Sequence, residues 1–233
     1  MQLFYFGKIE PDQSSIELPK DETRHISRVL RKKLGDQIHI TDGNGRLFLG
    51  TIMSITSTKC VVNLAFAKAE SQPTSSLHIA IAPTKMNDRM EWFLEKATEM
   101  GIARITPILC DHSERKKINL ERFEKIVVSA MKQSNRLFLP VLDELTDFRE
   151  FLLSTHGSRL IAHCEEDGEK SELINELQPH TCLLIGPEGD FSNEEIELAK
   201  SSGFKPVSLG PTRLRTETAG VYAAAIFNAT KLN

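Results

Sequence analysis

The sequence predicts a small β-rich domain followed by a larger α/β domain that is built on a mostly parallel sheet. The first seventy residues contain several short runs rich in Val, Ile, Thr and Phe, which are typical of strands. The polar stretch SQPTSS at 71–76 contains a proline and has the composition of a linker. Beyond it, strand-like runs alternate with helical periodicity, which is the pattern of a parallel sheet covered on both faces. We therefore expect domains at 1–70 and 77–233.

Four strands and one helix are expected in the first domain. The strands are predicted at 3–6, 36–42, 46–55 and 59–67. Asp-Gly-Asn-Gly at 42–45 separates two of them and favours a hairpin, because these residues tolerate positive φ. A helix is predicted around 21–33, where Ile26, Val29 and Leu30 follow the i, i+3, i+4 spacing of an apolar face.

In the second domain, strands and helices are expected to alternate. The predicted strands lie at 77–83, 103–109, 137–142, 158–164, 181–187 and 205–210. The predicted helices lie at 88–100, 119–134, 193–202 and 218–231. Asp88 with Glu91, and Ser192 with Glu195, have the spacing of N-terminal helix caps.

The composition excludes several classes of protein. Of the 233 residues 40% are hydrophobic, yet no apolar run approaches the roughly 18 residues that span a bilayer. The N-terminal residues lack the basic region and apolar core of a signal peptide. The four cysteines lie far apart without a C-x-x-C pair, which argues against a zinc site and a disulfide framework. We expect a cytoplasmic protein with no membrane segment and no metal.

The charge is segregated along the chain, although the net charge is only −3. Residues 21–33 hold five Lys or Arg against two acids, and residues 114–136 hold seven against three. Residues 142–176 hold ten acids and three bases. Two basic surfaces are therefore predicted on an acidic protein, although each could equally be a solvated helix face.

Two loops that follow predicted strands combine glycines with polar side chains. The first runs from Gly186 through Pro187, Glu188 and Gly189 into a capped helix, and the second is the polar stretch 208–219. Ligands of open α/β sheets bind at such carboxyl ends of strands, and glycines let the backbone approach them closely. The alternatives are an ordinary turn before a helix and an internal salt bridge between Arg215 and Glu217.

The two loops closely resemble the paired signature of the ribosomal RNA uridine-N3 methyltransferases, which belong to the knotted SPOUT class. They read LIGPEG and LGPTRLRTETA, and RHISRVLR, KMNDRMEWFLEKATEMGI and MKQSNRLFLP agree with the family in order. The resemblance implies a PUA-like, RNA-binding β-barrel domain at 1–70. It also implies a SPOUT α/β domain with a C-terminal trefoil knot at 77–233, and a homodimer formed through the knotted domain.

The resemblance also implies S-adenosyl-L-methionine as the cofactor, held between the two loops. The cofactor-binding residues would be His163, Ile185, Gly186, Pro187, Glu188, Gly189, Ser208, Leu209, Gly210, Leu214, Arg215, Thr216 and Thr218. Asp190 departs from the family, in which a second glycine usually follows Glu188-Gly189. Because Asp tolerates left-handed backbone geometry, we expect the fold to be kept there.

The reaction implied is methylation of N3 of a uridine in 16S ribosomal RNA, with the assembled small subunit as the favoured substrate. N3 carries a proton at neutral pH, so we expect Arg215 to stabilise the developing anion. Glu217 would act as a general base or would orient Arg215. The RNA-binding residues would be Arg24, His25, Arg28, Arg31, Arg115 and Arg136.

Three other interpretations remain open from the sequence. The chain could be a non-catalytic RNA-binding protein of the same fold, or it could methylate another RNA. It could also be a nucleotide-binding α/β enzyme, although both G-x-G-x-x-G and the P-loop motif are absent.

Overall fold

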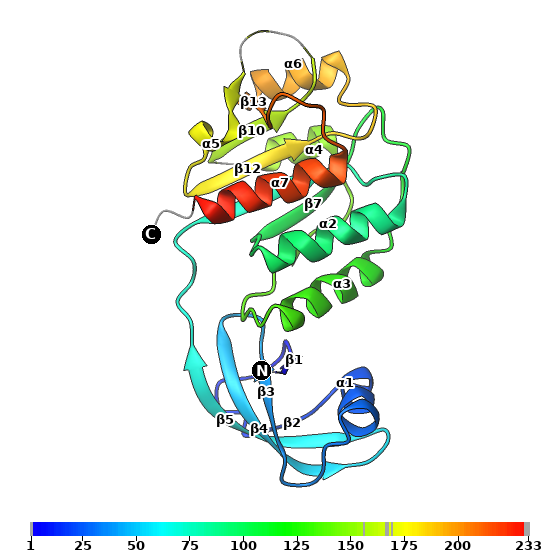
Figure 1. The fold of residues 1–233 in the computed structure, drawn as a ribbon, viewed down its shortest axis with the longest axis vertical. Coiled ribbons are helices and arrows are strands. Elements are labelled where there is room, and N and C mark those ends of the chain that lie inside the picture. Colours follow the sequence, from blue (N-terminus) through cyan, green and yellow to red (C-terminus); the bar gives the residue numbers. More distant parts are fainter. Residues whose placement is uncertain (1, 156, 166–167, 169, 231–233) are drawn as a thin grey trace. The chain divides into compact units, whose positions relative to one another are not determined.

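The computed structural model describes residues 2–155, 157–165, 168 and 170–230 (Figure 1). The chain divides into two compact units. Unit 1 comprises residues 1–72 together with 131–139, and unit 2 comprises residues 73–130 and 140–233.

Unit 1 is built on a five-stranded sheet in the order β1-β3-β4-β5-β2. Its elements are β1 (Leu3–Tyr5), β2 (Ser15–Glu17), α1 (Lys20–Arg24), the π-helix η1 (His25–Val29), β3 (Gln37–Thr41), β4 (Arg46–Ile55) and β5 (Cys60–Ala69). Only the β1–β3 pair is parallel. The sheet encloses an apolar core that includes Phe4, Ile26, Ile40 and Val62.

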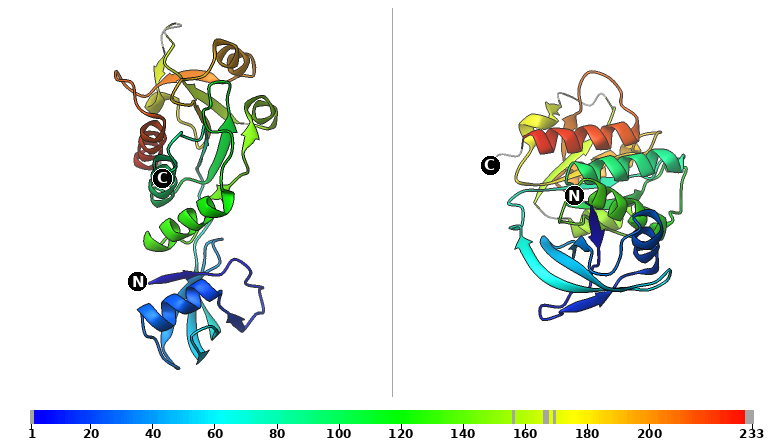
Figure 2. Two further views of the ribbon diagram at one scale, coloured as in Figure 1. Left: turned by 90° about the vertical axis from the view of Figure 1, so that its right-hand side faces the viewer. Right: turned by 60° about the horizontal axis from the view of Figure 1, so that its bottom comes forward.

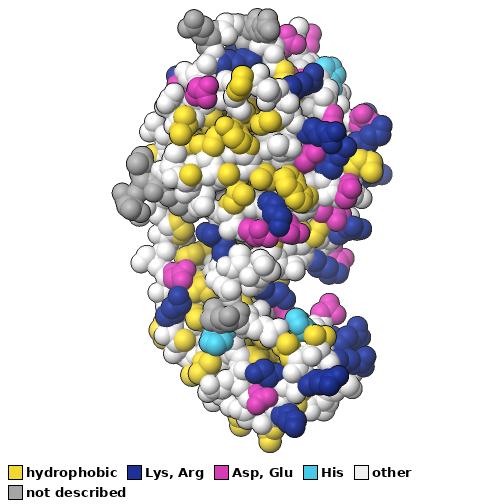
Figure 3. Space-filling model, in the orientation of Figure 1, with side chains coloured by type: hydrophobic (Ala, Val, Ile, Leu, Met, Phe, Trp, Pro, Cys, Tyr) yellow, Lys and Arg dark blue, Asp and Glu magenta, His cyan; other side chains and the backbone are white. Residues whose placement is uncertain are grey.

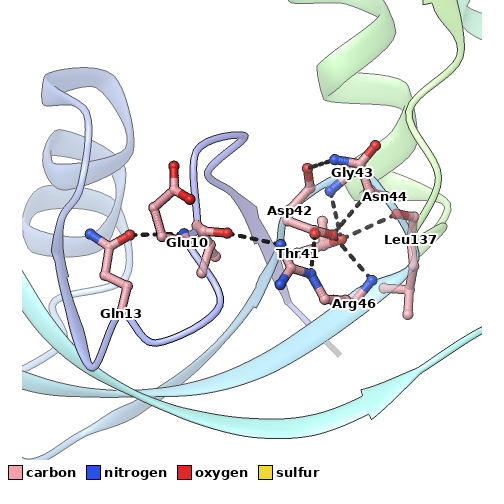
Figure 4. Close-up of polar contacts among 9 residues, drawn as sticks. Glu10, Gln13, Thr41, Asp42, Gly43, Asn44, Arg46 and Leu137 are labelled. Carbon is pink, nitrogen blue, oxygen red and sulfur yellow. Dashed lines mark hydrogen bonds and ion pairs between the residues drawn. The ribbon is translucent and has the colours of Figure 1, made fainter.

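The predicted hairpin forms between β3 and β4 and is organised by Asp42 (Figure 4). Asp42 is 1% exposed, and its Oδ1 accepts hydrogen bonds from the backbone N–H groups of Asn44 at 2.9 Å and Arg46 at 3.1 Å. Its Oδ2 accepts from Arg46 Nε at 2.6 Å. Because both oxygens of this buried carboxylate have donors, its burial is compensated within the turn.

The segment 137–139 does not form the predicted strand of unit 2, because its backbone groups bond to the β3–β4 turn. Gly45 N–H donates to the Leu137 carbonyl at 2.9 Å, and Leu139 N–H donates to the Gly43 carbonyl at 2.8 Å. Thr41 Oγ1 also donates to the Leu137 carbonyl (Figure 4). Of the predicted strand 137–142, only Val141–Leu142 pairs in a sheet, as β8.

The predicted helix at 21–33 ends early and contains a π-turn. Leu30 N–H bonds to the His25 carbonyl at 3.0 Å, an i→i−5 hydrogen bond that widens the helix. The wider turn shifts the following side chains around the axis, so Ile26 stays buried but Val29 is 69% exposed. The prediction that Val29 belongs to the core is therefore wrong. Arg31 follows the helix with a left-handed φ of 52°.

Unit 2 has the predicted parallel sheet, in the order β11-β13-β10-β12-β6-β7-β8, with β9 paired to β7. The strands are β6 (Ser76–Ile81), β7 (Arg104–Leu109), β8, β9 (Thr146–Asp147), β10 (Ser158–Ala162), β11 (Ser171–Glu172), β12 (His180–Ile185) and β13 (Lys205–Ser208). The helices are α2 (Asn87–Glu99), α3 (Leu120–Gln133), which continues into unit 1, α4 (Phe148–Ser154), α5 (Leu173–Glu176), α6 (Asn193–Ser201) and α7 (Thr216–Ala229).

Helices cover both faces of this sheet, as the alternating pattern predicts. Helices α2 and α7 lie on one face, and α4 and α6 lie on the other (Figure 2). The α4–α6 side contains a core in which Phe148, Phe151 and Ile196 pack on sheet residues such as Ile161 and Leu184. No helix within the described residues combines the length and apolar character needed to cross a bilayer.

One of the two predicted helix caps forms. Ser192 Oγ accepts from Glu195 N–H at 3.2 Å and Glu195 Oε2 accepts from Ser192 N–H at 2.9 Å, which completes the capping box of α6. Asp88 is not the N-cap of α2, because the helix starts one residue earlier, after Met86, and Asp88 lies in its first turn. The last helix begins at Thr216 rather than 218, and its predicted end at 231 lies outside the described residues.

The contact between α2 and α7 yields a stability prediction. A Cβ on Gly220 would lie 2.5 Å from Cε2 of the Phe93 ring, so Gly220→Val should overpack the contact between the two helices. We expect the free energy of unfolding to fall by about 1–3 kcal/mol in urea denaturation. Asn228→Val, which places the same side chain at an exposed position of α7, should change it much less. Equal losses in the two variants would indicate a general helix effect instead.

Candidate functional site

The candidate site lies where three neighbouring strands of unit 2 end. Strand β10 pairs in parallel with β12 on one side and with β13 on the other. Because parallel strands have their carboxyl ends at the same edge of a sheet, the loops that follow them meet there. These loops carry residues 163–165, 186–192 and 209–215.

A cavity of about 710 Å³ opens between these loops. This volume lies within the roughly 300–1,000 Å³ that is typical of small-molecule pockets. Most of the predicted cofactor-binding residues line it, namely His163, Ile185, Gly186, Pro187, Glu188, Ser208, Leu209, Gly210, Leu214, Arg215 and Thr216. Gly189 and Thr218 are not among the lining residues.

Several lining residues were not predicted from the sequence. They are Ala162, Cys164, Lys170, Asp190, Val207, Pro211, Thr212, Arg213 and Ala219. Asp190, Pro211, Thr212 and Arg213 lie in or beside the two loops, so their position in the sequence could have placed them among the predicted cofactor-binding residues. Cys164 and Lys170 lie in the segment after β10, outside both loops, and neither belongs to a sequence motif that would have indicated it.

The two signature loops are linked directly. Thr216 Oγ1 donates a hydrogen bond to the Gly186 carbonyl at 3.0 Å. Arg213 also donates a guanidinium N–H to the Glu188 carbonyl at 3.3 Å. Gly210 has a φ of 106° and lies in open space, so its backbone is reachable from the cavity.

Glu188 brings a carboxylate with one unused acceptor to the cavity wall. Its Oε1 accepts a hydrogen bond from Lys85 N–H at 2.9 Å. Its Oε2 is buried and has no hydrogen-bond partner among the described residues. A buried acceptor of this kind fits a ligand that carries hydroxyl or cationic donors. S-adenosyl-L-methionine has both, in its ribose and its ammonium group, so these residues fit the implied cofactor.

His163 lines the cavity and is held by Lys170. Lys170 Nζ donates to the His163 carbonyl at 2.8 Å and lies 3.2 Å from His163 Nδ1. A lysine ammonium has donors only, so the contact to Nδ1 requires this nitrogen to be an acceptor. The side chain is therefore positioned by the protein itself.

Arg215 and Glu217 do not form the ion pair that the sequence left open as an alternative. Arg215 is exposed and lines the cavity, whereas Glu217 is 6% exposed and is not a lining residue. Glu217 Oε1 lies 3.8 Å from Nε of Arg89 on α2. Glu217 Oε2 has no hydrogen-bond partner among the described residues. The two predicted catalytic side chains thus have different surroundings.

Four of the predicted RNA-binding residues lie in or just after the helical segment α1–η1 of unit 1. Arg24, Arg28 and Arg31 are exposed, and Figure 3 shows Lys and Arg side chains gathered over α1. His25 is half-buried, with its ring centroid 6.0 Å from that of Phe4. Arg136 also belongs to unit 1, and its burial lowers the pKa of its guanidinium from the usual value.

Arg115, the last predicted RNA-binding residue, makes hydrogen bonds within unit 2. Its Nε donates to the Thr84 carbonyl at 2.9 Å, and a second guanidinium N–H donates to the Lys85 carbonyl. Lys85 N–H in turn donates to Glu188. Arg115 therefore supports the loop that contacts Glu188. Within the described part of the chain, no three His, Cys, Asp or Glu side chains gather as a metal site would require.

Two family models match the chain in sequence. An RNA methyltransferase domain matches residues 70–228, and an RNA methyltransferase PUA domain matches residues 18–65. The fold class is therefore an α/β methyltransferase domain preceded by a PUA domain.

Curated and solved relatives cover nearly the whole chain. The ribosomal RNA small subunit methyltransferase E of Rickettsia conorii is 32% identical, over 95% of this chain and 92% of its own. A probable rRNA-methyltransferase from Porphyromonas gingivalis is 40% identical, has a TM-score of 0.90 and covers 98% of each chain. A putative methyltransferase from Legionella pneumophila, solved with bound SAM, is 29% identical, has a TM-score of 0.86 and covers 97% of this chain and 96% of its own. The chain therefore belongs to the family of PUA-containing RNA methyltransferases that includes the ribosomal RNA small subunit methyltransferase E proteins.

Proposed function

We propose that the protein is an S-adenosyl-L-methionine-dependent methyltransferase acting on N3 of a uridine in 16S ribosomal RNA. The observation that carries this proposal is the cavity that both signature loops line at the ends of β10, β12 and β13. The names of the relatives support the RNA substrate, and the SAM-bound Legionella protein supports the cofactor. We further propose that the enzyme works in the cytoplasm on the assembled small subunit.

The finer features of the fold belong to the same proposal. We infer a PUA-like barrel at 1–70 and a SPOUT domain with a C-terminal trefoil knot at 77–233. The mostly antiparallel sheet of unit 1 supports the barrel. Two observations support the knot. Strand β13 lies between β10 and β11 in the sheet, although it follows both of them in the sequence. After β13 the chain comes back to the loop that follows β12, where Thr216 donates its hydrogen bond to the Gly186 carbonyl.

Different residues of the cavity would make different kinds of contact with the cofactor. S-adenosyl-L-methionine, when bound, supplies an electrophilic methyl group. Gly186, Leu209 and Gly210 would hold it through backbone groups and apolar contact, because they line the cavity. Glu188 would accept a hydrogen bond through its unused Oε2. Gly189 and Thr218, which do not line the cavity, would act by shaping the turns beside it.

Arg215 is the proposed catalytic residue. Its guanidinium stays charged and offers several directed donors, and the side chain is exposed at the cavity. It can therefore stabilise the negative charge that develops on the uracil ring as N3 loses its proton. This stabilisation requires no general base of unusual strength.

Glu217 is the second proposed catalytic residue. Its buried Oε2 has no hydrogen-bond partner among the described residues, so it can accept a proton or a hydrogen bond. Because Glu217 contacts Arg89 of α2 and is not a lining residue of the cavity, a general-base role requires the uridine to reach the first turn of α7. Otherwise Glu217 acts by holding the first turn of α7, next to Arg215.

RNA binding is assigned to the surface formed by Arg24, His25, Arg28 and Arg31 in unit 1. Contacts from such residues to phosphates position an RNA without reading its sequence. Arg136 of unit 1 and Arg115 of unit 2 are two further proposed RNA contacts. Two of the guanidinium N–H groups of Arg115 already donate to carbonyls, so only its remaining N–H groups could contact an RNA.

We also propose that the protein is a homodimer that pairs through the α2–α7 face. Trp92 on α2 is 43% exposed and Tyr222 on α7 is 41% exposed. Figure 3 shows hydrophobic side chains gathered over these two helices. Exposed apolar surface of this kind is typical of an interface with another protein surface.

Replacing Arg215 tests the proposed chemistry. Arg215→Ala should reduce methyl transfer at least about 100-fold, because the developing anion loses its charged donor. The melting temperature should stay unchanged, since the side chain makes no capping hydrogen bond to α7. Transfer of labelled methyl to small subunits that lack uridine modifications, with mass mapping of the product, measures this. The control is Arg213→Ala, which removes the same charge from the same loop and should reduce methyl transfer less. Wild-type turnover in Arg215→Ala would remove Arg215 from the mechanism.

The basic surface of unit 1 gives a second test. Arg24→Ala with Arg28→Ala should weaken RNA binding and lower the slope of log K against log salt by about two, one for each lost phosphate contact. Cofactor affinity should not change. The control is Lys59→Ala with Lys68→Ala, which removes two lysines that are already paired with Glu17 and Glu70. An unchanged salt slope in the arginine variant would move the RNA surface elsewhere.

Light scattering tests the homodimer. The wild type should have twice the mass of one chain, and Trp92→Glu with Tyr222→Glu should have the mass of a single chain, because charges would enter the apolar face. Leu153→Glu, at an 84% exposed position of α4 on the opposite face, should leave the mass unchanged. A monomeric wild type would refute this part of the proposal.

A further inference from the structure

Asp190 occupies an unusual backbone position next to the cavity. It ends the Gly-Pro-Glu-Gly loop after β12 and has a left-handed φ of 66°. Its N–H donates to the Pro187 carbonyl at 2.9 Å, which closes the turn. Residues with a side chain are strained in this conformation, although Asp tolerates it better than most. Glycine would adopt this backbone conformation more easily than Asp. We therefore expect the Asp190 side chain to make contacts that offset the strain.

The Asp190 side chain connects the loop after β12 to the end of the neighbouring strand β10. Its Oδ2 accepts a hydrogen bond from Cys164 N–H at 2.7 Å, and its Oδ1 accepts from Phe191 N–H at 2.9 Å. The first distance is at the short end for a charge-assisted hydrogen bond. Partial desolvation, followed by the nearby negative charge of Asp190, raises the pKa of the Cys164 thiol.

The Asp190 backbone reaches a third strand end. Its carbonyl accepts a hydrogen bond at 3.1 Å from Nδ1 of His112, which lies in the loop after β7. In the sheet, β10 lies directly beside β12, whereas β7 lies on its other side beyond β6. One residue therefore ties the end of β12 to strand ends on both of its sides.

The part of the chain that Asp190 holds is a wall of the cavity. His163, Cys164 and Asp190 all line it. The His163–Cys164 corner is fixed from its other side by Lys170, whose Nζ donates to the His163 carbonyl. The distance between this corner and the Gly-Pro-Glu-Gly loop is thus set by the protein before any ligand enters.

We propose that Asp190 is a positioning residue for cofactor binding. Its carboxylate fixes the His163–Cys164 corner against the Gly-Pro-Glu-Gly loop, so that the two walls are preorganised for S-adenosyl-L-methionine. Preorganisation of this kind raises affinity because the ordering cost is met in the free protein. The inference rests on the proposed function, since it assigns the cofactor to this cavity.

The experiment compares Asp190→Gly and Asp190→Asn with the full-length wild type. Glycine keeps the left-handed backbone and removes the carboxylate, so Kd for S-adenosyl-L-methionine by calorimetry should rise about tenfold, the equivalent of one charge-assisted hydrogen bond. Amide hydrogen exchange at Cys164 and Phe191 should accelerate, and the loss should appear in KM for the cofactor rather than in kcat. Asparagine tolerates the same φ but keeps only one acceptor oxygen, so it should give intermediate values.

Asn135→Gly is the matched control, because Asn135 also has a left-handed φ, of 54°, but belongs to unit 1. It should leave Kd unchanged. Wild-type Kd and exchange in Asp190→Gly, or a loss confined to kcat, would overturn this role and leave the proposed function intact. If Asp190→Gly fails to fold, Asp190→Asn takes its place: wild-type Kd and exchange in that variant, or a loss confined to kcat, would overturn the positioning role. A wild type that does not bind S-adenosyl-L-methionine would refute the proposed function, and this role with it.

Discussion

The parallel pairing of β13, β10 and β12 is the constraint on which the candidate site depends. Because the three strands run in the same direction, their loops emerge at one edge and face one another across the cavity. Three hydrogen bonds then cross-link the loops: Thr216 to Gly186, Arg213 to Glu188, and Cys164 to Asp190. An antiparallel strand in the position of β10 would send its following loop to the opposite edge and leave the cavity without a wall.

The charged side chains around the cavity have separate tasks, which follow from what each one contacts. Lys170 and Asp190 are used inside the protein, where they hold the His163–Cys164 corner. Glu188 keeps a buried oxygen available beside the cavity, and Arg215 is exposed to it. Most of these charged groups thus have partners inside the protein, while Arg215 and one oxygen of Glu188 remain available to a ligand. This division explains how a polar site is built without leaving most of its charges uncompensated.

In unit 1 a buried charge is likewise compensated inside the protein, in this case within a turn. Asp42 is buried only because three donors within the β3–β4 turn meet its carboxylate. The ordered turn then offers Gly43 and Gly45 to the segment around Leu137, about ninety residues later in the chain. That segment takes part in unit 1 because its backbone hydrogen bonds are made there, so a sequence-based boundary near residue 70 does not describe the whole unit.

The sequence by itself determined the features that depend on neighbouring residues. These include the alternating strands and helices of unit 2, the Ser192–Glu195 capping box and the glycine-containing loops that line the cavity. Asp190 also adopts the left-handed geometry expected of it. Tertiary structure decided where distant segments meet. It directed Glu217 to Arg89, brought the segment around Leu137 to the β3–β4 turn and joined Asp190 to Cys164. Periodicity and capping act over a few residues, whereas these contacts depend on packing between segments far apart in the chain.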